Sequence, residues 1–197
     1  MKVDLSLVKQ LRESTSISVI ECKKALEETG GDIEKALVIL KKKGMLTSQK
    51  KALRETREGL IGAYVHLNGK IGVLIEVNTE SDFVAKNEEF KELVKNLTLQ
   101  ITASNPSWVD RESVPQEIID QEKEIIEAQF KDKGKPPAVV EKIVEGKLKD
   151  FYKENVLLEQ VYIKEEGMTV KEYIDSKIAK LGENIRVKRF VKYEIGE

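Results

Sequence analysis

The amino-acid sequence predicts an α+β fold. A small N-terminal bundle of three helices precedes a core in which a small antiparallel sheet packs with helices and an antiparallel coiled-coil-like helical hairpin protrudes. Three observations support this prediction. Short helical patterns with their own cap and stop residues fill residues 1–45. Two runs of alternating apolar residues flank Asn68-Gly69. Two charged helical patterns, each with a narrow apolar stripe, make up residues 116–155.

The composition fits a folded core with a highly charged surface. The chain has 197 residues, of which 40% are apolar and 35% are charged. The 34 Lys and Arg residues nearly balance the 35 Asp and Glu residues, so no net charge draws the chain to nucleic acid or to a membrane. Cys22 is the only cysteine, which excludes an internal disulfide and fits a reducing compartment. With no signal-like segment and no apolar run of ~20 residues, we expect a cytoplasmic protein.

The three-helix bundle is expected over residues 1–45. Residues at helical spacing mark its first helix: Leu5, Val8 and Leu11. Ser18–Glu21 matches a capping box at the start of the second helix. Asp32 can cap a third helix, which we expect to end at Gly44. This arrangement resembles a ubiquitin-associated-type domain.

Residues 46–58 are expected to form a linker, either irregular or helical, between the bundle and a core domain over 59–197. They have few large apolar residues and many charges. The basic stretch 41–57 has two interpretations, a phosphate-binding patch or a solvated helix end. The second is favoured because lysines suit the C-terminal end of a helix and no aromatic residues are interleaved for base stacking.

The core domain is expected to start with a β-hairpin. Asn68-Gly69 is a strong hairpin signal because both residues tolerate positive φ. Apolar residues alternate on either side of it: Ile61, Ala63, Val65 and Leu67, then Ile71, Val73, Ile75 and Val77. A helix with an apolar face from Phe90 to Ile101 follows. The two helices of 116–155 are joined by a break at Lys133–Pro137, and a capped helix that ends at Gly182 precedes a last strand over 185–195.

No group of catalytic residues stands out. His66 is the only histidine, which excludes a multi-histidine metal site. Cys22 lies in a predicted helix and is interpreted as a small buried apolar residue rather than a nucleophile. The sequence has no phosphate-binding loop, and its many acidic residues form no distinctive pair. We therefore expect no enzyme activity, no cofactor and no metal site, and a binding function remains.

The segment Ser81-Asp-Phe-Val84 is the main candidate for binding, and it has two interpretations. In the first, Ser81 or Asp82 caps a turn and Phe83 packs beneath it, which the residue pattern alone favours. In the second, the turn presents Phe83 to a pocket of a partner, because aromatic anchors often dominate the energy of an interface. Asp82 would then compete for polar or metal-linked groups of the partner.

Short segments over nearly the whole chain resemble the bacterial elongation factor Ts family. They are Leu7–Arg12, Glu21–Leu26, Gly31–Glu34, Gly72–Val77, Asp82–Ala85, Gly134–Pro136, Glu145–Leu148 and Gly182–Ile185. The Thr-Asp-Phe-Val of the family is Ser81-Asp-Phe-Val84 here, which keeps the capping hydroxyl. The Thr-Gly-Ala-Gly-Met-Met of the family is Thr15–Ile20 here, which keeps apolar residues at the paired Met positions but loses both glycines.

The resemblance implies guanine-nucleotide exchange on the GTPase elongation factor Tu. Residues 81–84 would insert beside the switch region of this partner and disturb its bound Mg²⁺. Phe83 would be the wedge, and Asp82 would hold polar groups in the shifted arrangement. No bond would be made or broken, so the chain would not be a bond-making enzyme.

The resemblance also implies further contacts. Val19 and Ile20 would touch the nucleotide domain of the partner. His66 matches a position that touches another partner domain, although an ordinary surface histidine on a strand is an equal alternative. Short members of the family have one core module and are expected to form a homodimer. A small sheet with an apolar face and an open edge also favours pairing.

Three other functions are compatible with parts of the sequence. The N-terminal bundle and the helical hairpin would suit a scaffold that binds ubiquitin-like proteins. The basic stretch 41–57 would suit an RNA-associated factor, with a steep dependence of binding on salt. An enzyme with a carboxylate site would need a pocket that the sequence does not indicate. The resemblance favours nucleotide exchange over all three.

Overall fold

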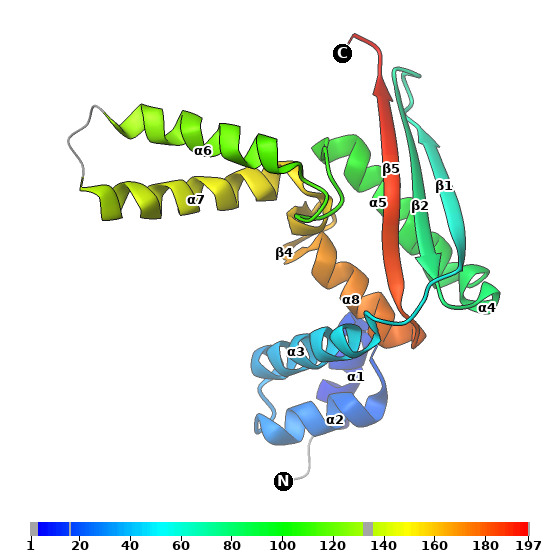
Figure 1. Ribbon diagram of the computed structural model, residues 1–197. Helices are drawn as coiled ribbons and strands as arrows, with labels where there is room; N and C mark the ends of the chain where they lie inside the picture. Colours follow the sequence, from blue (N-terminus) through cyan, green and yellow to red (C-terminus); the bar gives the residue numbers. More distant parts are fainter. Residues whose placement is uncertain (1–3, 16, 132–135, 197) are drawn as a thin grey trace. The chain divides into compact units, whose positions relative to one another are not determined.

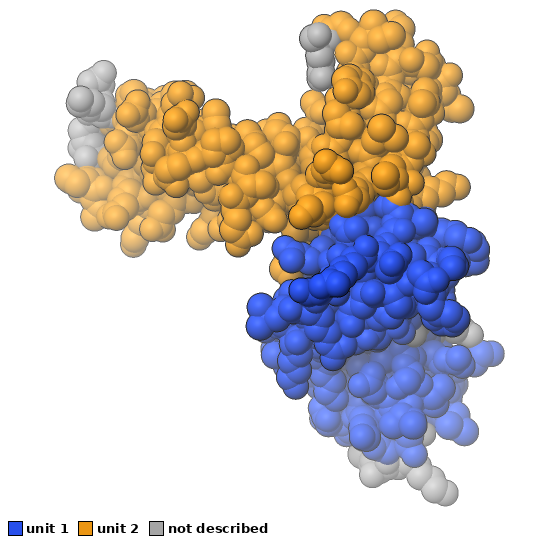
Figure 2. Space-filling model, turned by 45° about the vertical axis from the view of Figure 1, so that its right-hand side comes forward, with its two compact units in different colours: residues 1–60, 77–93, 172–186 blue, residues 61–76, 94–171, 187–197 orange. Residues whose placement is uncertain are grey.

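The computed structural model describes residues 4–15, 17–131 and 136–196 of the chain. The chain divides into two compact units (Figure 2). Unit 1 comprises residues 1–60, 77–93 and 172–186, and unit 2 comprises residues 61–76, 94–171 and 187–197. Helices and sheet are both present, which confirms the predicted α+β class.

Unit 1 begins with three helices that pack on one another, α1 (Leu5–Thr15), α2 (Val19–Glu28) and α3 (Ile33–Lys51) (Figure 1). Their shared core consists of Val8, Leu11, Cys22, Ala25, Leu26, Ala36 and Leu40. The side chains of Ser18 and Asp32 accept hydrogen bonds from backbone N–H groups of α2 and α3, so both predicted caps are confirmed. Leu5 is largely exposed, so the predicted stripe of α1 is buried only at its later positions.

The prediction that the third helix ends at Gly44 is wrong. Helix α3 continues for two further turns to Lys51. A glycine inside a helix costs only about 1 kcal/mol relative to alanine. Here good helix formers surround it, and the helix therefore includes the first part of the predicted linker. Gly30 and Gly31 do end α2, both with positive φ.

The main sheet has three strands, β1 (Glu58–Val65), β2 (Ile71–Thr79) and β5 (Ile185–Glu194), in the order β1-β2-β5. The predicted hairpin joins β1 to β2. His66 N–H donates to the carbonyl of Ile71 at 2.8 Å, and Gly69 has a φ of 67°. One face of this sheet, called the inner face below, carries the buried side chains of Val73 and Ile75 in unit 2.

Helix α5 (Glu88–Ser104) covers the inner face of the sheet. Gly62 permits the close contact in unit 2, because a Cβ atom there would lie 2.5 Å from Cγ1 of Val94. The opposite, outer face is exposed and apolar. Its exposed large apolar side chains are Ile61, Val65, Leu74, Val191, Tyr193 and Ile195, and the ion pair of Glu76 and Arg189 lies on the same face.

The predicted helical hairpin is present in unit 2 as α6 (Gln116–Lys131) and α7 (Pro137–Asn155), which run side by side in opposite directions (Figure 1). Ile126 and Val144 are buried, as expected of a narrow apolar seam. Pro137 opens α7, and most of the predicted break at Lys133–Pro137 lies outside the described residues.

A short segment that the sequence did not predict follows α7. It consists of the single-turn helix η1 (Leu157–Glu159) and the two-stranded antiparallel hairpin of β3 (Val161–Tyr162) and β4 (Glu165–Thr169). Helix α8 (Val170–Leu181) comes next, and Gly182, with a φ of 81°, follows its last residue as predicted.

Candidate functional site

The segment Ser81-Asp-Phe-Val84 forms a capped turn at the end of β2. Ser81 has extended dihedral angles, and its Oγ accepts a hydrogen bond from the N–H of Val84 at 3.4 Å. One helical turn, α4 (Asp82–Ala85), follows. Val84 and Ala85 are each only 5% exposed, so the turn is anchored from beneath. The predicted cap is therefore confirmed, and Ser81 provides it.

Phe83 is 79% exposed. The interpretation in which Phe83 packs beneath the turn is therefore wrong. Burial of a phenylalanine side chain is worth about 2–3 kcal/mol, and the folded chain forgoes most of this. A single exposed apolar residue is ordinary on a protein surface. Phe83, however, stands on a turn that its own neighbours hold in place, which suits an aromatic side chain that is presented to a partner.

Asp82 lies beside Phe83 and is also exposed. Its carboxylate accepts a hydrogen bond from Nζ of Lys86, one helical turn later, at 2.7 Å. This bond and the positive charge of Lys86 lower the pKa of Asp82, which is ionised at neutral pH. Exposed ion pairs of this kind contribute little to stability. Asp82 can therefore leave Lys86 for another partner at small cost.

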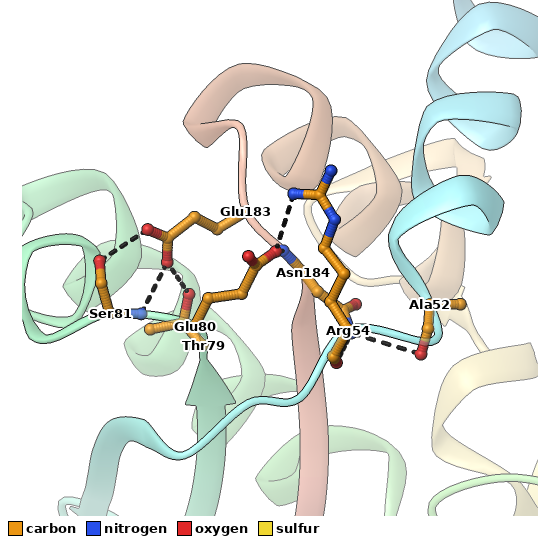
Figure 3. A network of polar contacts seen from close by, with 7 residues as sticks. All are labelled: Ala52, Arg54, Thr79, Glu80, Ser81, Glu183 and Asn184. Atoms are coloured by element: carbon orange, nitrogen blue, oxygen red, sulfur yellow. Dashed lines mark hydrogen bonds and ion pairs between the residues drawn. The ribbon is translucent and has the colours of Figure 1, made fainter.

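The carboxylate of Glu183 lies against the base of the turn (Figure 3). Oε2 accepts hydrogen bonds from the N–H of Ser81 and from Oγ1 of Thr79, both at 2.9 Å. Oε1 accepts a hydrogen bond from Oγ of Ser81 at 2.6 Å. Partial burial acts to raise the pKa of Glu183, but the hydrogen bonds from Ser81 and Thr79 outweigh it and lower the pKa.

A second set of contacts runs beside the first. Oε1 of Glu80 accepts a hydrogen bond from the N–H of Asn184 at 2.6 Å, and Nη1 of Arg54 lies 3.5 Å away. Nδ2 of Asn184 donates to the carbonyl oxygens of Arg54 at 2.9 Å and Ala52 at 3.4 Å (Figure 3). The segment 183–184 therefore joins the strand end that carries the turn to the end of α3, all within unit 1.

Sequence reasoning did not assign a function to Glu183 or Asn184. The segment Gly182–Ile185 contributed to the family resemblance, but the partners of its polar residues lie more than 100 positions away. The only local signal is a pair of polar residues between a helix-ending glycine and a strand.

Val19 and Ile20 are the first two residues of α2, and both are exposed, at 46% and 68%. They follow the cap residue Ser18, and later residues of the helix make the core contacts. Their predicted role in partner binding stays a prediction. Residue 16, one of the positions at which the chain departs from the family pattern, lies outside the described residues.

His66 lies just beyond β1, in unit 2, and is half-buried. Nδ1 is 3.2 Å from Oη of Tyr64, a hydrogen bond between side chains that are two residues apart. This contact fits both alternatives, the partner-binding residue and the ordinary surface histidine.

The structure describes residues 4–15, 17–131 and 136–196. Across these residues, no cluster of three or more His, Cys, Asp or Glu side chains could hold a metal ion. Cys22 is buried in the core of the three helices. None of the helices in the described part of the chain is long and apolar enough to cross a membrane.

Comparison with known proteins gives a consistent result over the full length. The model of the family described as elongation factor TS matches residues 7–197. The elongation factor Ts of Thermotoga neapolitana is 57% identical over 197 residues, which cover all of this chain and 99% of that protein. The elongation factor Ts of Coprothermobacter proteolyticus is 54% identical, with full coverage of both chains. That of Thermodesulfovibrio yellowstonii is 53% identical, with 98% of its length covered.

Proposed function

The chain belongs to the elongation factor Ts family of translation elongation factors, and we propose that it is a guanine-nucleotide exchange factor. It binds the GDP-bound form of elongation factor Tu in the cytoplasm and speeds the release of GDP, so that GTP can bind in its place. The observation that supports this proposal most directly is that Phe83 is 79% exposed, while the next two residues of the same turn, Val84 and Ala85, are buried.

The turn acts as a wedge. Phe83 enters a pocket beside the switch region of the GTPase, and Asp82 exchanges Lys86 for polar groups of the displaced region. Mg²⁺ offsets the charge of the phosphates, so disturbance of its site weakens nucleotide binding. Each ~1.4 kcal/mol of weakening lowers the affinity about tenfold, so two or three lost contacts accelerate release by orders of magnitude.

Linkage makes the effect reciprocal. A factor that weakens GDP binding to the GTPase must itself bind less tightly when nucleotide is present. Entry of GTP therefore expels the factor, and each molecule serves many GTPase molecules without making or breaking a bond.

Val19 and Ile20 provide a second contact with the nucleotide domain of the partner in this proposal. Their exposure at the start of α2 leaves both side chains available. His66 provides a contact with another domain of the partner.

We also propose that the chain forms a homodimer through the outer face of its main sheet. This face carries six exposed apolar side chains in unit 2: Ile61, Val65, Leu74, Val191, Tyr193 and Ile195. Several exposed apolar side chains on one face of a folded protein are typical of an interface. A second copy fits because an identical apolar face is complementary to it in chemistry, and twofold pairing is the commonest form of assembly.

The function is tested by the release of a fluorescent GDP analogue from purified elongation factor Tu after a chase with unlabelled GDP. We expect release to accelerate with the concentration of this chain and to reach a plateau. Excess unlabelled GDP should also dissociate the complex of the two proteins, as reciprocity requires. Absence of acceleration at any concentration, together with capture of ubiquitin-like proteins, would favour the scaffold alternative.

A further inference from the structure

We propose that Glu183 is a positioning residue that holds the turn 81–84 in the orientation that presents Phe83 to the partner. This inference rests on the proposed function of the turn as a wedge. Phe83 is mostly exposed, so its own side chain does little to fix its direction. Its position therefore depends on the backbone of the turn and on the groups that hold that backbone.

Glu183 contacts the turn at its first residue. The backbone N–H and the hydroxyl of Ser81 both donate to the carboxylate, at 2.9 and 2.6 Å. The third donor is Oγ1 of Thr79, a fully buried residue at the end of β2, at 2.9 Å. The carboxylate of Glu183, which lies between α8 and β5, therefore binds both Thr79 at the end of β2 and the cap residue Ser81.

The direction of these hydrogen bonds matters for the cap. The hydroxyl proton of Ser81 points toward Glu183, so the oxygen lone pairs are free to accept the N–H of Val84. A carboxylate accepts only, which enforces this direction. Glu183 therefore fixes the rotamer of Ser81, and Ser81 in turn caps α4, the helical turn that carries Phe83.

A further hydrogen bond joins the same two segments, with the carboxylate now on the segment that carries the turn. Glu80, beside Ser81, accepts the N–H of Asn184, beside Glu183. The two chain segments are therefore joined by side chain to backbone bonds from each to the other. Gly182, with a φ of 81°, gives the chain the sharp turn that brings Glu183 to this place, because other residues rarely adopt this conformation.

Glu183→Gln is the informative substitution because it keeps the size of the side chain. An amide has one oxygen and one NH₂ group, so it can accept the N–H of Ser81 only if its NH₂ faces the hydroxyl. The hydroxyl must then accept from Gln with one of its two lone pairs, and its proton loses the carboxylate acceptor that fixes the rotamer of Ser81. Glu183→Ala removes all three hydrogen bonds and provides a second variant.

The test measures GDP-analogue release from elongation factor Tu at saturating factor, together with the factor concentration that gives half of the maximal rate. We expect Glu183→Gln to lower the maximal rate about three- to tenfold, the range for loss of one well-placed hydrogen bond. The half-saturating concentration should change less than twofold by the same scale. In the isolated protein, amide hydrogens of Ser81 and Val84 should exchange faster than in the wild type.

A double-mutant cycle separates positioning from general stability. If Glu183 acts through Phe83, then Glu183→Gln should change the rate less than about twofold in a Phe83→Ala background. Glu89→Gln is the matched control. This carboxylate also lies in unit 1 and is also hydrogen-bonded, but to Lys177 and Lys180 of α8. It should leave the maximal rate unchanged.

The outcomes are distinct. A wild type that accelerates release, and a Glu183→Gln variant that matches it or loses the same factor in both backgrounds, would overturn the positioning role and leave the exchange function intact. A wild type that does not accelerate release would overturn both. A loss confined to the background that contains Phe83, with faster exchange of the two amides, supports the proposal.

Discussion

Gly62 of β1 lies so close to Val94 of α5 that a Cβ atom at Gly62 would come within 2.5 Å of Val94 Cγ1. Ile75 and Thr98 also lie within 3.3 Å of that position. A larger residue at position 62 would therefore displace the Val94 side chain or the helix that carries it.

The first prediction concerns this contact. Gly62→Ala should lower the free energy of unfolding by about 1–3 kcal/mol, the usual cost of overpacking a core. Gly72→Ala is the control, because it lies in the neighbouring strand and no atom lies within 4 Å of its Cβ position. Unfolding by urea, followed by circular dichroism, measures both. Equal stability of the two variants would show that α5 moves without cost.

The second prediction concerns pH. Hydrogen bonds from Lys177, and then from Lys180, lower the pKa of Glu89 from 4.5 to about 2. A carboxylate with a lowered pKa in the folded state adds stability above its unfolded value, and this is lost as the pH falls. Glu89→Gln should therefore cost about 1 kcal/mol at pH 7, a value reduced by solvent screening because the Glu89 side chain is 33% exposed.

The difference in unfolding free energy between the wild type and Glu89→Gln should shrink as the pH falls from about 4.5 toward 2. Urea unfolding at a series of pH values measures this. A difference that stays constant over that window would show that the three charges do not interact as the structure indicates.

The third prediction concerns Asn184, which is buried and donates to the carbonyl oxygens of Ala52 and Arg54. Asn184→Ala should cost about 1–2 kcal/mol, since the two hydrogen bonds that the buried amide donates are lost. Asn184→Asp should cost more, because a carboxylate oxygen would face the same two carbonyl oxygens. Thermal unfolding gives the order of stability, and an aspartate variant as stable as the wild type would contradict these contacts.

The fourth prediction concerns assembly. A lysine in place of Ile61, which is 73% exposed, should convert a dimer into a monomer without loss of helix content. Leu53→Lys, at a residue that is 97% exposed in unit 1, should leave the dimer intact. Light scattering during size-exclusion chromatography gives the mass directly. A wild-type chain that is monomeric at micromolar concentration would contradict the proposed homodimer.

Much of the fold could be predicted because its signals are local. Asn68-Gly69 specifies a hairpin, and the caps Ser18, Asp32 and Ser81 act within three residues of their own position. The helical hairpin of α6 and α7 follows from two apolar stripes. The family resemblance rests on short segments along the chain, and the match of the family model over residues 7–197 confirms it.

The errors have physical causes. The end of α3 was misplaced because a single glycine only weakens a helix. The β3–β4 hairpin was missed because the two residues of β3 are too few to show alternation. Alternation on β1 showed that the strand has two faces, but it could not show that Ile61 and Val65 are on the uncovered one. That depends on where α5 packs.

The candidate site was only half predictable for a similar reason. Ser81 and Phe83 stand together in the sequence, and the exposure of Phe83 decided between two interpretations that the pattern had left open. Glu183 reaches the same turn from 102 positions away. No period or spacing can reveal such a contact, because only the folded sheet brings the two segments together.

The most direct test is the effect of Phe83→Ala on the maximal rate of GDP-analogue release from elongation factor Tu. We expect the rate to fall at least tenfold, the equivalent of about 1.4 kcal/mol, while binding to the GTPase survives. Leu53→Ala, at another exposed apolar residue, should keep the wild-type rate. A Phe83→Ala variant with the wild-type maximal rate would contradict the wedge.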